Sequence, residues 1–170
     1  MILLQRFLQI CLFRAGPADV PSSYGFLKIV CLIYFAVGVL VSRVDHNWPL
    51  SLAGSFADTC LLLVVCGLLL YYRGFSSRFA QTATAMAGTG SLLGLLGLPI
   101  FWLFRQVEPS GQLTSLVLLL VLLLVFWSLF VTAHIFRYAL DIKPGMAALV
   151  TVLYTIISLL VVGLAMSGAA

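Results

Sequence analysis

Charged residues are scarce in this sequence. Of its 170 residues, only 8% are Asp, Glu, Lys or Arg, whereas 63% are hydrophobic. A water-soluble domain carries roughly 25% charged residues, because charged side chains cover much of the surface that faces water. The composition therefore excludes a soluble globular domain and predicts a protein that is surrounded mostly by lipid.

The sequence also lacks the residue patterns of common catalytic and metal sites. Its four cysteines form no CxxC pair and no Cys/His cluster, so we expect neither a disulfide framework nor a metal site. No nucleophile–base arrangement is present, and no glycine-rich loop could hold a phosphate group. We therefore expect that the protein is not an enzyme and that it binds no cofactor and no metal.

Five long apolar segments are separated by short polar connections. Crossing the hydrocarbon core takes about 20 apolar residues in a helix. Segments of this kind cover residues 26–42, 49–72, 79–104, 113–136 and 145–167. Connections such as RVDHNW and RGFSSR are too short to hold a soluble domain, so consecutive spans should be antiparallel neighbours. We predict an all-α membrane protein in which residues 26–167 form one domain, a bundle of five transmembrane helices.

The N-terminal segment, residues 1–18, precedes the first span and has an amphipathic pattern. Read as a helix, it carries Gln5, Arg6 and Gln9 on one face. The opposite face is apolar and consists of Leu3, Leu4, Phe7, Leu8 and Cys11. Arg6 interrupts the apolar run and no small-x-small cleavage site follows, which argues against a signal peptide. We predict an interfacial helix that lies along the lipid headgroups.

Lysine and arginine are distributed unequally between the two ends of the predicted spans. Seven of the nine lie on one side, namely Arg6, Arg14, Lys28, Arg73, Arg78, Arg137 and Lys143. They fall singly or in pairs and form no patch, so we expect no nucleic-acid partner despite the net charge of +4. Because positive residues favour the cytoplasm, we predict a cytoplasmic N-terminus and a periplasmic C-terminus in a bacterial inner membrane.

Small residues concentrate in the third span, in the run AQTATAMAGTGSLLGLLG. Its Ala83, Ala87, Gly90 and Gly94 lie at positions i, i+4, i+7 and i+11, so they share one face of the helix. A face with so little side-chain bulk lets another backbone approach closely. We predict that this helix-packing face lies inside the bundle, against the second span, while the leucine-rich fourth span faces lipid.

One acidic residue, Asp58, lies inside the second span, in the stretch SFADTCLLLVVCGLLL. An ionised aspartate near the bilayer centre costs about 2.5–3.5 kcal/mol on insertion scales. Asp58 should therefore face the bundle and be either protonated or provided with polar partners. Ser51 and Ser55 precede it at i−7 and i−3, so the three form one polar stripe on an apolar helix.

Partners for Asp58 can be sought by counting depth along the other spans. Ser91 in the third span and Ser158 in the fifth span fall near its level, and Thr155 shares a helix face with Ser158. We predict an intramembrane polar cluster of Asp58, Ser55, Ser91, Thr155 and Ser158, in which a protonated Asp58 donates to a hydroxyl group. The remaining titratable candidate, His134, is expected near the inner end of the fourth span, in contact with headgroups or solvent.

The last third of the chain resembles a known membrane domain. A tryptophan late in the fourth span, Trp127 in VFWSLFVTAHIFRYALDIKPGMAALVTVLY, precedes a short basic loop and a small-residue start to the fifth span. This arrangement resembles the Yip1-type five-span domain, whose eukaryotic members are implicated in vesicle trafficking. The sequence has neither the long polar N-terminal region nor the DLYGP-like motif of those members. The resemblance therefore implies a five-span fold with a scaffold or accessory role, and it implies no trafficking role and no functional residues.

Two functions remain open from the sequence alone. The first is a small non-enzymatic polytopic membrane protein that acts through contacts with membrane lipids, with other membrane proteins or with a second copy of itself. The alternative is a small transporter or channel component with a proton or cation site at Asp58. The first rests on the absence of a catalytic pattern, and the second rests on the cost of placing a carboxylate in lipid.

Overall fold

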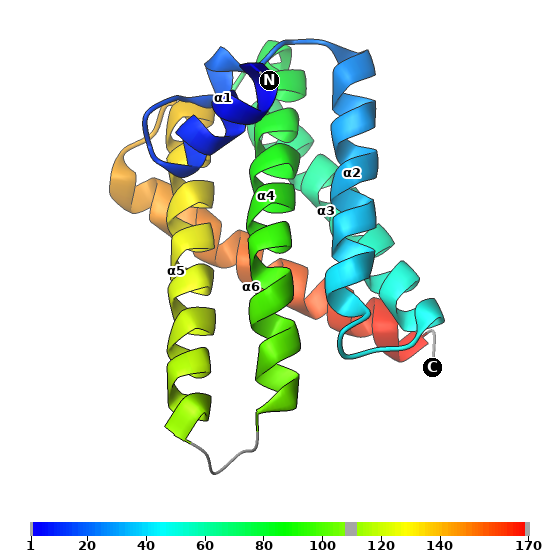
Figure 1. The fold of residues 1–170 in the computed structure, drawn as a ribbon. Coiled ribbons are helices and arrows are strands. Elements are labelled where there is room, and N and C mark those ends of the chain that lie inside the picture. Colours follow the sequence, from blue (N-terminus) through cyan, green and yellow to red (C-terminus); the bar gives the residue numbers. More distant parts are fainter. Residues whose placement is uncertain (1, 108–111, 169–170) are drawn as a thin grey trace.

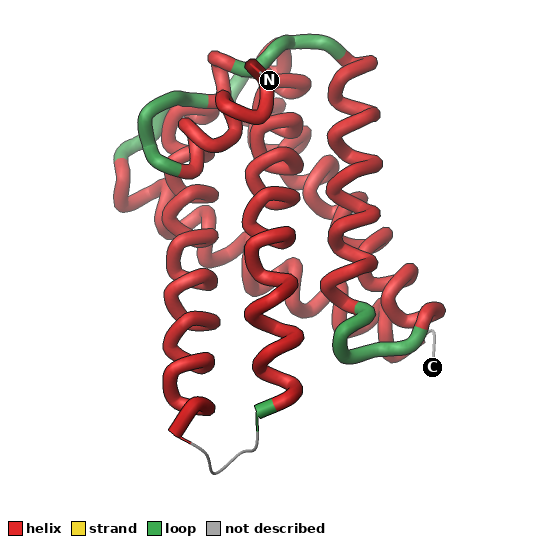
Figure 2. Tube along the Cα trace, viewed as in Figure 1, coloured by secondary structure: helices red, strands yellow, loops and turns green. Residues whose placement is uncertain are grey.

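The computed structural model describes residues 2–107 and 112–168, and this part consists of helices joined by short loops, with no strand (Figure 2). Part of the predicted loop after the third span lies outside the described residues, as does the side chain of Leu3. Two short 3-10 helices, η1 (Pro17–Asp19) and η2 (Ser76–Arg78), lie between α-helices. The α-helices are α1 (Ile2–Cys11), α2 (Tyr24–Ser42), α3 (Trp48–Tyr72), α4 (Phe79–Gln106), α5 (Gln112–Leu140) and α6 (Pro144–Gly168) (Figure 1).

Five of these helices are long and apolar enough to cross a membrane: α2 to α6, with η2 extending α4. Two of these helices, α2 and α3, begin directly after residues whose side chains cap the helix N-terminus. The Ser23 side chain accepts a hydrogen bond from the backbone N–H of Phe26, and the Asn47 side chain accepts one from Leu50. The predicted spans match these helices closely, although α5 continues past residue 136 to Leu140. The fold is thus compatible with a polytopic membrane protein.

Helix α4 lies at the centre of the bundle. It contacts α1, α2, α3 and α5, and Figure 1 shows it upright between α2 and α5, with α6 crossing obliquely behind. Its N-terminal half is almost completely buried, and the side chains of Ala83 and Ala87 are fully buried. By contrast, most large side chains of α5 and α6 are exposed. The small residues of the third span therefore form the inside of the bundle.

The helix-packing face of α4 contacts a different helix from the one that we expected. Gly90 and Gly94 face α2, the first span, and not α3: a Cβ atom at Gly90 would lie 2.6 Å from a ring carbon of Tyr34, and one at Gly94 would lie 2.8 Å from Val37. Helix α3 packs mainly against α6 and α2 and less against α4, whereas α4 packs most extensively against α2.

Helix α1 packs against the bundle through a narrower face than the sequence suggested. Phe7 and Cys11 are buried together with Ile10, whereas Leu4 and Leu8, which were expected on the same face, are exposed. The ring of Phe7 lies so close to Gly88 of α4 that a Cβ atom there would overlap it. Part of the apolar surface of α1 is thus used for docking on α4. Its position along the headgroups stays a prediction.

Two side chains of α5 hold the N-terminal segment in place. The indole N–H of Trp127 donates to the carbonyl of Cys11 at 2.9 Å, and Nε2 of His134 lies 2.9 Å from the carbonyl of Ala15. The His134 ring also contacts the rings of Phe13 and Tyr138 edge-on. His134 therefore binds backbone from the same chain and does not simply face headgroups or solvent, as we had expected. These two bonds cap carbonyl groups that no helix satisfies.

The close contact between α4 and α2 yields a first prediction. Gly90→Leu would place four carbons where the ring of Tyr34 lies, so it should destabilise the folded protein by about 1–3 kcal/mol. Leu119→Ala, at an exposed position of α5, should have little effect because surrounding detergent or lipid fills the space. Thermal unfolding in mild detergent measures both. If both variants unfold at the same temperature as the wild type, Gly90 does not lie in a packed interface.

A second prediction concerns the hydrogen bond from Trp127 to the Cys11 carbonyl at the end of α1. Burial raises the pKa of the Cys11 thiol to about 11, so its thiolate is rare at pH 8 and maleimide labelling should be slow and accelerate as the pH rises towards 11. Trp127→Phe removes the hydrogen bond to the Cys11 carbonyl. A loss of about 1 kcal/mol should raise the labelling rate about fivefold.

The labelling experiment uses a variant in which Cys31, Cys60 and Cys66 are replaced by alanine, so that only Cys11 reacts. Trp102→Phe is the matched control, because the side chain of Trp102 is exposed at the far end of α4. The proposed hold of α5 on α1 is wrong if both tryptophan variants label at the same rate as the parent.

Candidate functional site

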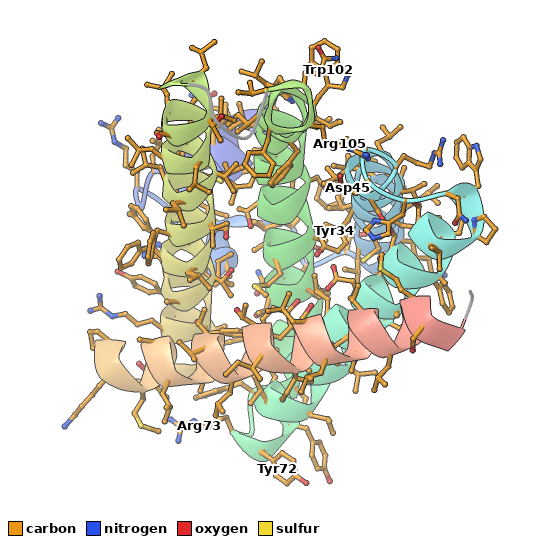
Figure 3. The ribbon with its side chains drawn as sticks, turned by 90° about the horizontal axis from the view of Figure 1, so that it is seen from below. Tyr34, Asp45, Tyr72, Arg73, Trp102 and Arg105 are labelled. Carbon is orange, nitrogen blue, oxygen red and sulfur yellow. The ribbon has the colours of Figure 1, made fainter. Side chains whose placement is uncertain are left out.

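Asp58 of α3 is bound by hydroxyl groups from two other helices. The hydroxyl of Tyr34 on α2 donates to Oδ2 at 2.5 Å, and Oγ of Ser158 on α6 donates to Oδ1 at 2.7 Å. Seen from below, Tyr34 lies on the side of α2 that faces α4 (Figure 3). Each carboxylate oxygen thus has one donor, and the three helices α2, α3 and α6 meet at one side chain.

Of the residues predicted to surround Asp58, only Ser158 forms a hydrogen bond with it in the described part of the chain. The hydroxyl of Thr155 donates instead to the carbonyl of Thr151. Ser91 donates to the carbonyl of Ala87, and the buried Ser55 lies against Gly38 of α2. Serine and threonine in a helix readily bind the carbonyl four residues earlier, which is why depth alone did not identify the partners.

Tyr34 is the partner that the sequence analysis missed. In the sequence, Tyr34 looks like an ordinary aromatic residue of an apolar span. Its ring packs in the interior of a bundle as well as a phenylalanine ring does. A signal was nevertheless present, since Tyr34 is the only residue between 26 and 41 that carries a hydroxyl group. A buried tyrosine hydroxyl needs a hydrogen-bond partner. Asp58 is the acidic residue available inside the bundle to provide one.

The position of Tyr34 depends on Gly90. A Cβ atom on Gly90 would lie 2.6 Å from Cε2 of the tyrosine ring, well inside van der Waals contact. The ring can therefore cross α4 at this level only because residue 90 has no side chain. The small-residue face and the Asp58 cluster, which were predicted as separate features, are parts of one arrangement.

The Asp58 carboxylate opens into a cavity of about 320 Å³ between α2, α3, α4, α5 and α6. Its apolar lining is made mostly of leucines and other hydrophobic residues. Its polar lining consists of Tyr34, Asp58, Thr89, Ser128, Thr132, Tyr154, Thr155 and Ser158. This volume lies within the range of roughly 300–1,000 Å³ that is typical of small-ligand sites. The cavity is therefore large enough to hold water or a small ligand beside the carboxylate.

Among the residues that the structure describes, no lysine, arginine or histidine lines this cavity. In the described part of the chain, the one ion pair is that between Arg105 and Asp45, with 3.2 Å between Nη1 and Oδ1, and it lies near the end of α4 (Figure 3). We had expected a protonated Asp58 that donates to a hydroxyl. Both of its oxygens lie at hydrogen-bond distance from a hydroxyl group, and the protonated state stays a prediction.

Comparison with known proteins identifies no relative of this chain: no family model, no curated protein and no solved structure matches it. The resemblance to Yip1-type domains therefore stays a prediction.

Removing either donor should weaken the contact between the helices. Tyr34→Phe and Ser158→Ala each delete one hydroxyl bonded to Asp58, and each should lower the free energy of unfolding by about 0.5–2 kcal/mol. Tyr154→Phe is the matched control, because Tyr154 lines the same cavity and its hydroxyl has no hydrogen bond with the described residues. Unfolding in mixed detergent measures all three. A Tyr154→Phe variant as unstable as Tyr34→Phe would contradict the assignment.

Proposed function

We propose that this chain is a small non-enzymatic membrane protein that binds a proton or a small cation at Asp58, as a component of a transporter or channel. The observation that supports this function best is a carboxylate that opens into an intramembrane cavity with no cationic side chain in its lining. In the one ion pair among the described residues, by contrast, Asp45 meets Arg105 directly.

The first step of the argument concerns charge. A carboxylate within apolar helices is costly unless its charge is neutralised. Hydroxyl donors from Tyr34 and Ser158 reduce this cost but add no positive charge. Neutralisation must come from a proton on Asp58 or from a cation beside it. The cavity gives such a cation room to reach the carboxylate.

The second step concerns coupling to the helices. Asp58 joins α2 to α6 through its two oxygens. A proton on one oxygen, or a cation that attracts both, competes with the hydroxyl donors and so changes the strength of both contacts. Occupancy of the site is therefore linked to the packing of three helices. A transporter or channel component needs such a link in order to change its conformation when a proton or cation binds.

A purely structural role for Asp58 is the competing explanation. An interhelical hydrogen bond stabilises a bundle by itself, and it needs no cavity beside it. The open space next to Asp58, together with the hydroxyl of Tyr154 in its wall, favours a ligand. If the site proves to be structural, the remaining function is action through contacts with lipid or with other membrane proteins.

Infrared difference spectroscopy of the protein in nanodiscs tests this function directly. A step in pH, or the addition of Na⁺ or K⁺, should change the carboxyl and carboxylate bands of Asp58. Asp58→Asn should remove that change while leaving the helical circular dichroism unaltered, because the amide is nearly isosteric and keeps most of the hydrogen bonding.

Asp45→Asn is the matched control, since it makes the same chemical change at an exposed residue outside the cavity. Its difference spectrum should retain the Asp58 bands. The proposed function is excluded if wild type and Asp58→Asn give the same spectra under every pH and cation condition.

A further inference from the structure

A second cavity, larger than the first, lies under the N-terminal segment. It has a volume of about 570 Å³ and is enclosed by residues 13–19, by the start of α4 and by the end of α5. Figure 1 shows the N-terminal segment passing over these helix ends. The cavity lies where predicted spans begin and end, and therefore at the level expected for lipid headgroups. It shares no residue with the cavity at Asp58.

Hydrogen bonds to backbone groups fix the walls of this cavity. His134 binds the carbonyl of Ala15, and the Gln81 side chain donates to the carbonyl of Ala18 at 3.4 Å. The carboxylate of Asp19 accepts from the backbone N–H of Gly16 at 2.8 Å. On the far side, Arg73 donates to the carbonyls of Leu140 and Asp141. Segments distant in sequence are thus held around one space.

The cavity is lined by charges of both signs. Arg14 and Arg78 supply two cationic side chains, and Asp19 and Asp141 supply two carboxylates. The guanidinium of Arg78 also lies over the ring of Phe75, with Cζ 4.5 Å from the ring centroid. None of these four residues forms an ion pair with another within the described part of the chain. Opposite charges that share a cavity without pairing can each bind a group on a ligand. This pattern favours a ligand that itself carries both charges.

Aromatic rings form the third part of the lining. Phe13, His134 and Tyr138 make a row with ring centroids 5.3 Å and 4.8 Å apart, and all three line the cavity. Aromatic faces attract cations, and the guanidinium of Arg137 already lies over the ring of Tyr138, with Cζ 5.4 Å from the ring centroid. Arginine side chains bind phosphate well because their N–H groups can form two parallel hydrogen bonds with its oxygens. A phosphate and an ammonium group are the two ligand charges that this lining suits best.

We propose that this cavity binds a phosphoethanolamine group, with its phosphate at Arg14 and Arg78 and its ammonium at Asp141. A primary ammonium has three N–H donors for a carboxylate, which the quaternary ammonium of phosphocholine lacks. A purely anionic headgroup would leave Asp19 and Asp141 facing like charge. The group can come from the headgroup of a phospholipid or from the free phosphate monoester.

Native mass spectrometry of the full chain in mild detergent tests the site. The probes are phosphatidylethanolamine, phosphatidylglycerol and phosphatidylcholine with identical acyl chains, and the first should bind most tightly. Arg78→Gln and Asp141→Asn each remove one charge that contacts the group, so each should weaken phosphatidylethanolamine binding about tenfold. Both residues are exposed, and circular dichroism verifies that the variants fold.

Lys143→Gln is the matched control, because Lys143 is exposed near the same end of α5 but does not line the cavity. It should leave the binding unchanged. Free O-phosphoethanolamine is added as a competitor: displacement of the lipid shows that the group alone suffices, and failure to displace it assigns the site to the intact phospholipid.

Two results would overturn the inference. One is equal or tighter binding of phosphatidylglycerol, because an anionic headgroup would then be sufficient. The other is equal binding of all three lipids that neither Arg78→Gln nor Asp141→Asn alters.

Discussion

The small side chains of α4 are the constraint on which the rest of this structure depends. Because Gly90 has no Cβ, the ring of Tyr34 crosses α4 and places its hydroxyl on Asp58. Because Gly88 has none, Phe7 inserts beside the same helix and docks the N-terminal segment. Neither contact could form around a larger residue. One helix surface thus positions both the intramembrane carboxylate and the segment that covers the second cavity.

The two cavities differ in chemistry in a way that matches their depth. Around Asp58 the lining is apolar with hydroxyl groups and contains no basic residue. At the helix ends the lining carries charges of both signs and three aromatic rings. Ions in the hydrocarbon region must be few and neutralised locally, whereas the headgroup region tolerates many. A cation site deep in the bundle and a headgroup site at its end are therefore independent proposals that rest on different residues.

Much of the architecture could be predicted from composition and pattern, since a helix that crosses lipid needs a long apolar run and leaves an obvious signal. Asp58 was conspicuous because a carboxylate in such a run is costly. Its partner Tyr34 was not conspicuous, because a tyrosine among apolar residues resembles any other residue of a hydrophobic core. The bonds from Trp127 and His134 to backbone carbonyls join residues more than a hundred positions apart. Such contacts leave no local pattern, so only the fold reveals them.

Ion flux into proteoliposomes tests the central claim, that Asp58 handles a proton or a small cation, most directly. Vesicles that contain the wild-type protein should take up protons, Na⁺ or K⁺ faster than empty vesicles, and vesicles with an equal amount of folded Asp58→Asn should not. Indistinguishable flux in wild type, Asp58→Asn and empty vesicles for all three ions would contradict the account and leave Asp58 as a contact between helices.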